Sequence, residues 1–376
     1  MLDAGRLQES WRAVAAHGDQ VPLHFYAALF LEDPEIRDMF PVGMAVQRDR
    51  LVAALGRIVS SVDDIGAVAP LVRQLGRDHR RFGVRREHYP AVGRALLATL
   101  EHFSGPAWAP ELAQDWGAAY DAVARMMIEA ADAAAGTPAW WDLDVVRVER
   151  RAPGIAVLTV IPREPLPYRA GQSIAVEVPA RPRLWRYLTP ATLPAADGSF
   201  ELHVRLVPGG QVSAALVQAV EPGDVLRAGA AVGQRLTLPA GGRRSLLLVA
   251  GGTGLAPMKA LIEQLRAEDA GRPTHLVWGA RRSRDLYDLP AMRRLAAGCT
   301  WLHLVPCASH EAAPGGDVEA GTVLDVALRR GPWPDHEVYV CGSPAMVRGT
   351  VEGLCRAGVA PERVRVEDLG SEEAAR

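Results

Sequence analysis

The chain has 376 residues, of which 49% are hydrophobic and 23% are charged. That length is too great for one ordinary hydrophobic core, so two or three domains are expected. A formal net charge of -2 and scattered arginines argue against nucleic-acid and membrane-surface binding. No run of about eighteen apolar residues and no apolar leader is present, and the cysteines fit no zinc or iron–sulfur spacing. We therefore expect a reduced, cytoplasmic protein.

Residues 1–135 carry the periodicity of α-helices. Apolar residues recur at three- and four-residue steps, as in LVAALGRIV and RALLATLEHF, and strand-like alternation is absent. Prolines such as Pro34, Pro41 and Pro70 stand where helices would begin or end. This pattern predicts an all-α domain.

Residues 140–240 carry short β-branched runs instead. The runs DVVRVERR, IAVLTVI, SIAVEV and FELHVRLV alternate polar and apolar residues, and Pro/Gly turns separate them. Regular short strands without intervening helices are typical of an antiparallel barrel or sandwich. The change of pattern near Gly136 marks a domain boundary.

Residues 241–370 alternate strands with helices. SLLLVAGG is a continuous apolar run, as expected of a parallel strand buried on both faces, and the helix KALIEQLRAE follows it. Further strands are expected in THLVWGA, WLHLVPCA and EVYVCGS. The alternation predicts a doubly wound parallel sheet. The fold class is therefore multidomain: all-α, then antiparallel β, then α/β.

A glycine-rich turn, VAGGTGLAPM, joins the first of these strands to its helix. Glycine lets the backbone turn tightly and approach a pyrophosphate, while the helix N-terminus offers N–H groups and a positive dipole end. A purely structural turn would use the same residues. The residues predicted to bind a nucleotide are Gly251, Gly252, Thr253, Gly254, Leu255, Ala256 and Pro257.

Three motifs of this domain, AGGTGLAPM, VWGARR and VYVCGSPAM, resemble in that order the NAD(P) module of the ferredoxin-reductase family. The resemblance implies NAD(P)H as a cofactor, with Cys341, Gly342 and Pro344 beside its nicotinamide. A buried structural thiol is the alternative for Cys341. The arginines of the RRSR segment either contact a cofactor phosphate or lie solvated on the surface, so the choice between NADH and NADPH stays open.

In the same family an FAD-binding barrel precedes this module, and two segments of residues 140–240 resemble its motifs. The first is RYLT, which comprises Arg186, Tyr187, Leu188 and Thr189. Arg186 would meet the flavin pyrophosphate, and Thr189 would place a hydroxyl near the reactive flavin nitrogen. The second segment would neutralise phosphate with backbone N–H groups; it comprises Gly209, Gly210, Gln211, Val212 and Ser213.

Three aromatic residues typical of that FAD site are replaced in this chain. Leu188 holds the stacking position, since Tyr187 is one residue off and should face the other way. Ser173 and Leu369 hold the other two positions, while Glu367 matches the usual acid. A stacking ring adds roughly 0.5–1.5 kcal/mol, or about two- to tenfold in affinity. We expect FAD to bind less tightly; a decayed flavin site is the alternative.

Three segments of the first domain resemble the bacterial haemoglobin domain in order and spacing: HFYAALFLEDPEIRDMF, QRDRL and LGRDHRRFGVRREHYPAVGRALL. Nearly the whole chain then resembles the flavohaemoglobin family, which implies haem b as a third cofactor. His79 is the expected proximal iron ligand because a neutral imidazole nitrogen binds haem iron. His88 is its rival and fits a non-ligand position.

The resemblance assigns four residues to the distal side of the haem. Tyr26 would donate a hydrogen bond to bound oxygen, and Phe40 would wedge against the haem plane. Gln47 and Leu51 would face the pocket one helical turn apart. Plain core packing would suit Leu51 and Phe40 equally well.

On the proximal side, Tyr89 matches a tyrosine that joins the ligand histidine and a glutamate in a hydrogen-bond network. Such a network makes the histidine a more electron-donating ligand. The glutamate position holds Ala131. Glu129 and Asp132 are expected to point elsewhere on the helix, so a weaker electronic effect on His79 is predicted.

The resemblance implies nitric oxide dioxygenase activity: NAD(P)H reduces FAD, electrons pass to haem, and oxygen reacts with nitric oxide to give nitrate. Two other interpretations stay open. One is an oxygen- or NO-binding or sensing globin with an impaired reductase, and the other is a reductase with a different acceptor. The expected partners are small molecules (O2, NO and NAD(P)H), and a monomer or weak dimer is expected.

Overall fold

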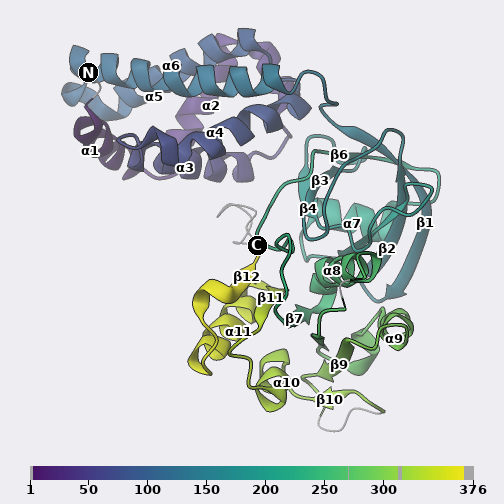
Figure 1. Ribbon diagram of the computed structural model, residues 1–376. Coiled ribbons are helices and arrows are strands. Elements are labelled where there is room, and N and C mark those ends of the chain that lie inside the picture. Colours follow the sequence, from purple (N-terminus) through teal and green to yellow (C-terminus); the bar gives the residue numbers. More distant parts are fainter. Residues whose placement is uncertain (1–2, 270, 312–315, 368–376) are drawn as a thin grey trace. The chain divides into compact units, whose positions relative to one another are not determined.

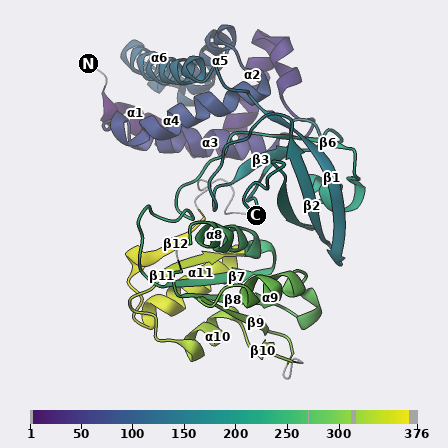
Figure 2. The ribbon, with the colours of Figure 1, turned by 45° about the vertical axis from the view of Figure 1, so that its right-hand side comes forward.

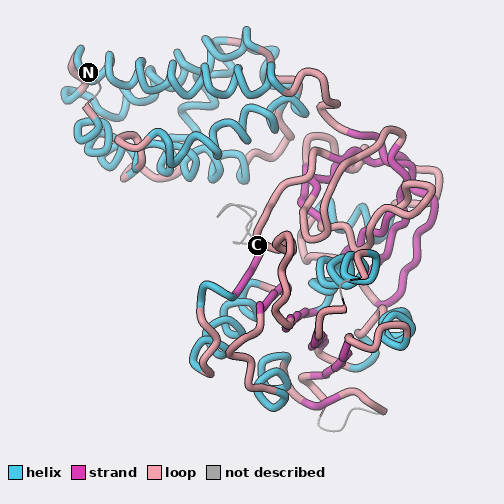
Figure 3. Tube along the Cα trace, viewed as in Figure 1, coloured by secondary structure: helices cyan, strands magenta, loops and turns pink. Residues whose placement is uncertain are grey.

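The computed structural model describes residues 3–269, 271–311 and 316–367, which form two compact units that meet in sequence between Trp140 and Trp141. The first unit is helical and the second carries two sheets (Figure 1, Figure 3). The predicted succession of an all-α domain, an antiparallel sheet and a parallel sheet is confirmed. The break between the units coincides with the change of sequence pattern.

The helices of the first unit are α1 (Ala4–Ala15), α2 (Gln20–Glu32), α3 (Ala45–Ser60), α4 (Ile65–His79), α5 (Tyr89–Ser104) and α6 (Pro110–Ala133), with 3₁₀ turns at Pro34–Met39, Arg80–Phe82, Arg86–His88 and Gly105–Ala107. In this unit α1, α2, α3, α5 and α6 contribute apolar side chains to a shared core, and α4 buries Val68, Ala69 and Val72. Leu7, Phe25, Leu29, Leu100 and Trp116 belong to the shared core, and burial of each such side chain contributes about 1.5–3 kcal/mol. None of the described helices, in either unit, is long and apolar enough to cross a membrane.

Helix α4 is held so that its last residue, His79, lies close to α6. Asp64 caps the start of α4 by accepting a hydrogen bond from the Ala67 N–H at 3.2 Å. Near its end, Gly76 approaches α6 so closely that a Cβ there would overlap the Met127 carbonyl oxygen. Only glycine permits this approach, which fixes the last turn of α4 against α6.

Pro70 does not mark a helix end, so that prediction is wrong. The residue lies inside α4. Its ring meets the carbonyl of Gly66, four residues earlier, and removes one hydrogen bond. The packing of α4 outweighs this local loss. A local sequence pattern does not contain that packing energy, so it could not predict a proline inside the helix.

The second unit begins with an antiparallel barrel sheet. A bridge between Pro190 and Leu202 connects the segment after β4 to β5. The expectation of strands alone is wrong, because the helix α7 (Gln211–Ala214) continues as a π-helix over Ala215–Ala219 and packs into the barrel core. The strands are β1 (Trp141–Ala152), β2 (Ile155–Pro162), β3 (Ile174–Glu177), β4 (Trp185–Leu188), β5 (Phe200–Arg205) and β6 (Val225–Ala228), in the order β4-β3-β6-β1-β2-β5.

A parallel sheet follows, with helices on both faces (Figure 2). Helices α8 (Leu255–Ala267) and α9 (Leu289–Ala297) cover one face, and α10 (Val323–Arg330) and α11 (Pro344–Arg356) cover the other. The chain order reverses between β7 and β11, which is where doubly wound proteins bind nucleotides. The strands are β7 (Leu246–Gly251), β8 (Thr274–Ala280), β9 (Leu302–Ala308), β10 (Glu319–Ala320), β11 (Glu337–Cys341) and β12 (Val364–Val366), in the order β10-β9-β8-β7-β11-β12.

Candidate functional site

His79, the residue predicted to bind iron, ends α4. Its Nδ1 lies 2.6 Å from the carbonyl oxygen of Leu75. Because a carbonyl only accepts hydrogen bonds, Nδ1 carries the proton. Burial lowers the pKa of His79, and the hydrogen bond to Leu75 opposes this shift. The lowered pKa favours the neutral ring. Nε2 then has a lone pair to offer a metal, so the side chain fits a haem iron.

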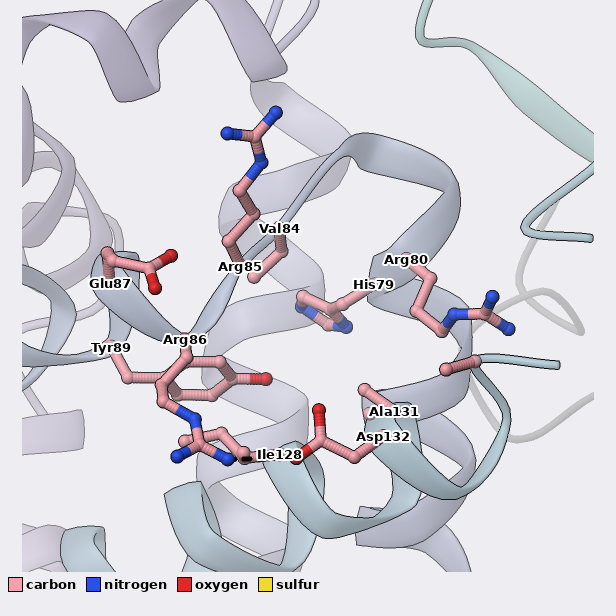
Figure 4. A pocket seen from close by; sticks show the side chains of 12 residues that line it. His79, Arg80, Val84, Arg85, Arg86, Glu87, Tyr89, Ile128, Ala131 and Asp132 are labelled. Atoms are coloured by element: carbon pink, nitrogen blue, oxygen red, sulfur yellow. Dashed lines mark hydrogen bonds and ion pairs between the residues drawn. The ribbon is translucent and has the colours of Figure 1, made fainter.

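A pocket of about 530 Å³ lies beside His79 (Figure 4). Tyr89, at the start of α5, points its hydroxyl into this space. The structure therefore brings together the two residues that the sequence assigned to the proximal side. The pocket is lined by Gly76, His79, Arg80, Val84, Arg85, Arg86, Glu87, Tyr89, Ile128, Ala131, Asp132 and Ala135.

Asp132 also lines this pocket, so the expectation that it points elsewhere is wrong. It follows Ala131 in the last turn of α6, where both residues border the same space (Figure 4). Its carboxylate pairs with Arg86 at 2.9 Å. Burial raises the pKa of Tyr89 to about 12, and the charge of Asp132 acts in the same direction. The charge of Asp132 therefore acts on Tyr89. This acid lies one residue after Ala131, where the family resemblance puts the glutamate.

His88, the rival ligand, has a structural role. Its Nδ1 accepts a hydrogen bond from the backbone N–H of Arg85 at 3.0 Å and caps the 3₁₀ turn before α5. Of the two histidines, His79 and not His88 lines the pocket. The geometry thus favours His79 as the ligand.

The residues predicted for the distal side also lie together. The Tyr26 hydroxyl donates to the Gln47 carbonyl oxygen at 3.1 Å, and its ring meets Phe40 edge-to-face with centroids 5.4 Å apart. Leu51 packs on the same core cluster as these two rings. The side-chain oxygen of Gln47 is buried and has no hydrogen-bond partner among the described residues. An unpaired buried acceptor costs about 1–3 kcal/mol; rotation of the amide would instead present its N–H groups, the donors that a bound oxygen ligand needs.

In the barrel, β4 presents its residues alternately to two faces. Leu188 pairs opposite Ile174 and is only partly buried against the barrel core, whereas Tyr187 pairs opposite Ala175. Tyr187 therefore faces the other way, as predicted, and cannot replace the missing ring at Leu188. Arg186 lies on the same face of the strand as Leu188.

A set of three polar groups surrounds the end of β4. The Ser173 hydroxyl lies 2.8 Å from the Thr189 hydroxyl and donates to Glu367 Oε1 at 2.9 Å, while Thr189 donates to the same oxygen at 3.2 Å. Desolvation by its neighbours raises the pKa of Glu367, although the residue as a whole is exposed, and these two hydroxyl groups oppose the shift. Ser173 is thus a member of the polar set and not simply a lost aromatic. Leu369 lies outside the described residues.

The GGQVS segment offers backbone and not side-chain groups. Ser213 Oγ accepts from the Val207 N–H and donates to the Gly210 carbonyl, both at 3.1 Å. Val212 is buried in the barrel core, and Gly209 has a left-handed φ of 74°. The Gly210 N–H already donates to the Val207 carbonyl at 2.9 Å, so the other N–H groups of the segment are the ones that would meet a phosphate.

The glycine turn joins β7 to α8, as predicted, and lies at the switch point of the sheet. Gly252–Gly254 form a 3₁₀ turn after β7, and α8 begins at Leu255. Leu255, Ala256 and Pro257 bury their side chains in the helix–sheet core. Of these three residues only Leu255 and Ala256 have a backbone N–H group, and that of Leu255 already donates to the Gly252 and Thr253 carbonyls. Pro257 has no N–H group, so its part is structural and the binding role predicted for it is wrong.

Cys341 ends β11 directly against this turn. A Cβ at Gly254 would overlap the Cys341 carbonyl oxygen, so the two motifs are in contact. Burial, together with the charge of Glu367, raises the pKa of Cys341, which keeps it a thiol. Pro344 follows in the first turn of α11. The predicted nicotinamide residues are thus placed beside the predicted phosphate turn.

Sequence reasoning missed Trp278, which supports the glycine turn from β8. Its indole N–H donates to the Gly252 carbonyl at 3.0 Å, and the side chain is fully buried. A tryptophan inside a buried parallel strand must find an acceptor for its N–H. Its place in VWGARR was therefore a usable signal.

The helical unit with its half-buried His79, the barrel and the dinucleotide sheet define a class: haem- and flavin-dependent oxidoreductases. Family models agree, since Globin matches residues 23–127, Oxidoreductase FAD-binding domain matches 155–235 and Oxidoreductase NAD-binding domain matches 248–352. The chain is 31% identical over 370 residues to the Flavohemoprotein of Deinococcus radiodurans, covering 91% of this chain and 89% of that one. The chain belongs to the flavohaemoprotein family, whose cofactors are haem, FAD and NAD(P)H.

Solved structures share the fold. A flavohemoglobin from Malassezia yamatoensis, with bound FAD and heme, has a TM-score of 0.78 at 19% identity and covers 98% of each chain. The FAD/NAD-binding domain of a nitric oxide dioxygenase from Vibrio cholerae has a TM-score of 0.53 at 19% identity; the match covers 60% of this chain and 97% of that one. At this identity both likenesses establish the fold alone.

Proposed function

We propose that the chain is an NAD(P)H-dependent nitric oxide dioxygenase, with haem held by residues 1–135, FAD by 140–240 and the nicotinamide cofactor by 241–370. When bound, these cofactors supply the redox chemistry that turns nitric oxide and oxygen into nitrate. The observation that carries the proposal is that His79, whose Nδ1 is bonded to the Leu75 carbonyl, lies in the same helical unit as a half-buried polar pair, Tyr26 and Gln47.

Three residues of the helical unit, His79, Tyr26 and Gln47, each have a role in this proposal. His79 offers Nε2 to iron while the Leu75 carbonyl fixes its tautomer. Burial raises the pKa of Tyr26, so its phenol remains a hydrogen-bond donor. To donate to a diatomic ligand, Tyr26 exchanges its present acceptor, the Gln47 carbonyl. The Gln47 side chain supplies a second polar contact.

In the reductase unit, Arg186 and the backbone of the GGQVS segment meet the flavin phosphates. Thr189 presents its hydroxyl near the flavin nitrogen, and the start of α8 receives the dinucleotide phosphates. Cys341, held as a thiol, borders the nicotinamide.

The test is rapid mixing of the oxygenated, NADH-reduced holoprotein with nitric oxide, followed by nitrate analysis. We expect one nitrate for each nitric oxide consumed. Tyr26→Phe should keep its haem but react about a hundredfold more slowly, as expected when one hydrogen-bond donor is lost. Slow nitrate formation with fast flavin reduction would instead indicate another acceptor, and haem without flavin in the purified protein would indicate a sensing globin.

A further inference from the structure

Lys259 is the only lysine among the 42 lysine and arginine residues of the chain. It lies in α8, shortly after the glycine turn, and its side chain is only 10% exposed. Lysine is ordinarily a surface residue, and a buried cation must be paired. The partners of Lys259 therefore indicate its role.

Two carboxylates contact its ammonium group. Nζ lies 2.6 Å from Glu201 Oε2 and 3.4 Å from Asp288 Oδ2. Arg151 also pairs with Asp288. We name these four residues, Lys259, Glu201, Asp288 and Arg151, the Lys259 cluster. Burial opposes ionisation of Glu201, but hydrogen bonds from His203 and Lys259 hold its pKa below the usual range. The cluster thus balances two cations with two anions.

The Lys259 cluster joins the two sheets of the second unit. Glu201 and Arg151 come from β5 and β1 of the barrel, whereas Lys259 and Asp288 come from α8 and the residue before α9. All four side chains are at most 19% exposed, so water screens their charges little. Loss of one partner leaves an unpaired buried charge, which is far more costly than loss of an exposed pair.

On one side, contacts run from the cluster to the glycine turn. His203 lies 3.2 Å from Glu201 Oε2 through Nε2 and 2.7 Å from the Tyr287 hydroxyl through Nδ1. Tyr287 packs edge-on against Trp278, with ring centroids 5.6 Å apart. Trp278 in turn donates to the Gly252 carbonyl at 3.0 Å. The cluster therefore supports the backbone at which the dinucleotide phosphates are expected.

On the other side, contacts run to the segment after the flavin strand β4. The Glu201 carbonyl accepts from the Ala191 N–H at 2.8 Å, and the Glu201 N–H donates to Thr192 Oγ1 at 3.0 Å. Farther along α8, Glu263 accepts from the Leu193 N–H at 3.0 Å. Helix α8 is thus attached at two points to elements that adjoin the flavin strand.

We propose that Lys259 is a positioning residue for flavin reduction, which holds the dinucleotide turn at a fixed distance from the flavin strand. A compact ammonium with three rotatable donors can bridge two carboxylates, whereas a planar guanidinium presents its donors in a fixed fork. This difference explains a lysine at one place in a chain that otherwise uses arginine. Hydride transfer requires reacting atoms about 3–3.5 Å apart, so a small loosening slows it.

The first test is anaerobic stopped-flow reduction of the FAD-loaded protein by NADH. Lys259→Met should lower the limiting rate constant of flavin reduction about 10- to 100-fold, while the NADH concentration giving half that rate changes much less. Lys259→Arg keeps the charge but not the shape, so its rate constant should lie between those of the wild type and K259M. Flavin reduction by K259M at the wild-type rate, whatever its Tm, would overturn the proposal.

Arg293→Met is the matched control. It also replaces a cation in the parallel-sheet part, but the pair that it breaks, with Asp317, is exposed, with side chains 48% and 57% accessible. We expect R293M to reduce flavin at the wild-type rate. This test measures only flavin reduction, so its result does not depend on whether the protein oxidises nitric oxide.

The second readout needs no turnover and no K259M protein. Because lysine occurs once, amine-specific reductive methylation can modify only the N-terminal amine and Lys259. In the native wild-type protein we expect the N-terminal amine alone to react, and in Glu201→Gln we expect Lys259 to become reactive. Methylation of native wild-type Lys259 at the rate of the N-terminal amine, or equal protection in E201Q, would contradict the proposed pairing.

Discussion

Asp132→Asn separates two effects of this acid: its effect on the pKa of Tyr89 and its contribution to the stability of the helical unit. The Asp132 and Arg86 side chains are 63% and 68% exposed, so loss of their pair costs about 0.2–1 kcal/mol. That amount lowers the Tm of the helical unit by only a few degrees. The pKa of Tyr89, in contrast, is about 12 against an ordinary 10.0, because of burial first and of Asp132 second. D132N should therefore lower this pKa by less than about 1, since burial remains.

An NMR titration of protein carrying carbon-labelled tyrosine measures this pKa directly. Arg86→Gln is the matched control, because it breaks the same ion pair but leaves the Asp132 charge in place, and it should not lower the Tyr89 pKa. Equal effects of the two substitutions on Tyr89 would refute the reasoning.

Three further predictions concern packing, pH and FAD affinity. Gly76→Ala should lower the Tm of the helical unit by several degrees, since overpacking against the Met127 backbone costs about 1–3 kcal/mol; an unchanged calorimetric Tm would contradict this. Desolvation raises the pKa of Glu367 in the folded protein above its ordinary 4.5. The folded protein therefore loses stability as the pH rises from the pKa of the unfolded chain to the higher pKa of the folded state. Glu367→Gln should flatten this part of the Tm profile of the reductase unit, and superimposable profiles would count against it. Leu188→Tyr should tighten FAD binding about two- to tenfold in a fluorescence titration; unchanged affinity would mean that residue 188 does not meet the flavin.

The parts of the site that lie within one motif could be predicted from the sequence. His79 with its Leu75 partner, and the glycine turn before α8, depend on neighbours a few residues away. Turn chemistry therefore suffices for the glycine turn, whereas His79 was predicted from the resemblance of its motif to the bacterial haemoglobin domain. Pro70 shows the limit of the same approach, because its place inside α4 depends on packing with the other helices.

The parts that join distant segments could not be predicted. The side chain of Asp132 lines the proximal pocket because of how the end of α6 meets the start of α5. The Lys259 cluster unites β1, β5, α8 and the segment before α9, so no local pattern contains it. A lone lysine in an arginine-rich chain was visible as an oddity, but its partners required coordinates.

The central claim is that the His79 imidazole holds the haem iron. Its most direct test is the absorbance spectrum of His79→Ala purified beside His88→Ala, the rival histidine that caps a turn. We predict that H79A loses the Soret band while its flavin band persists, and that H88A keeps both. An intact, unshifted Soret band in H79A would contradict the account.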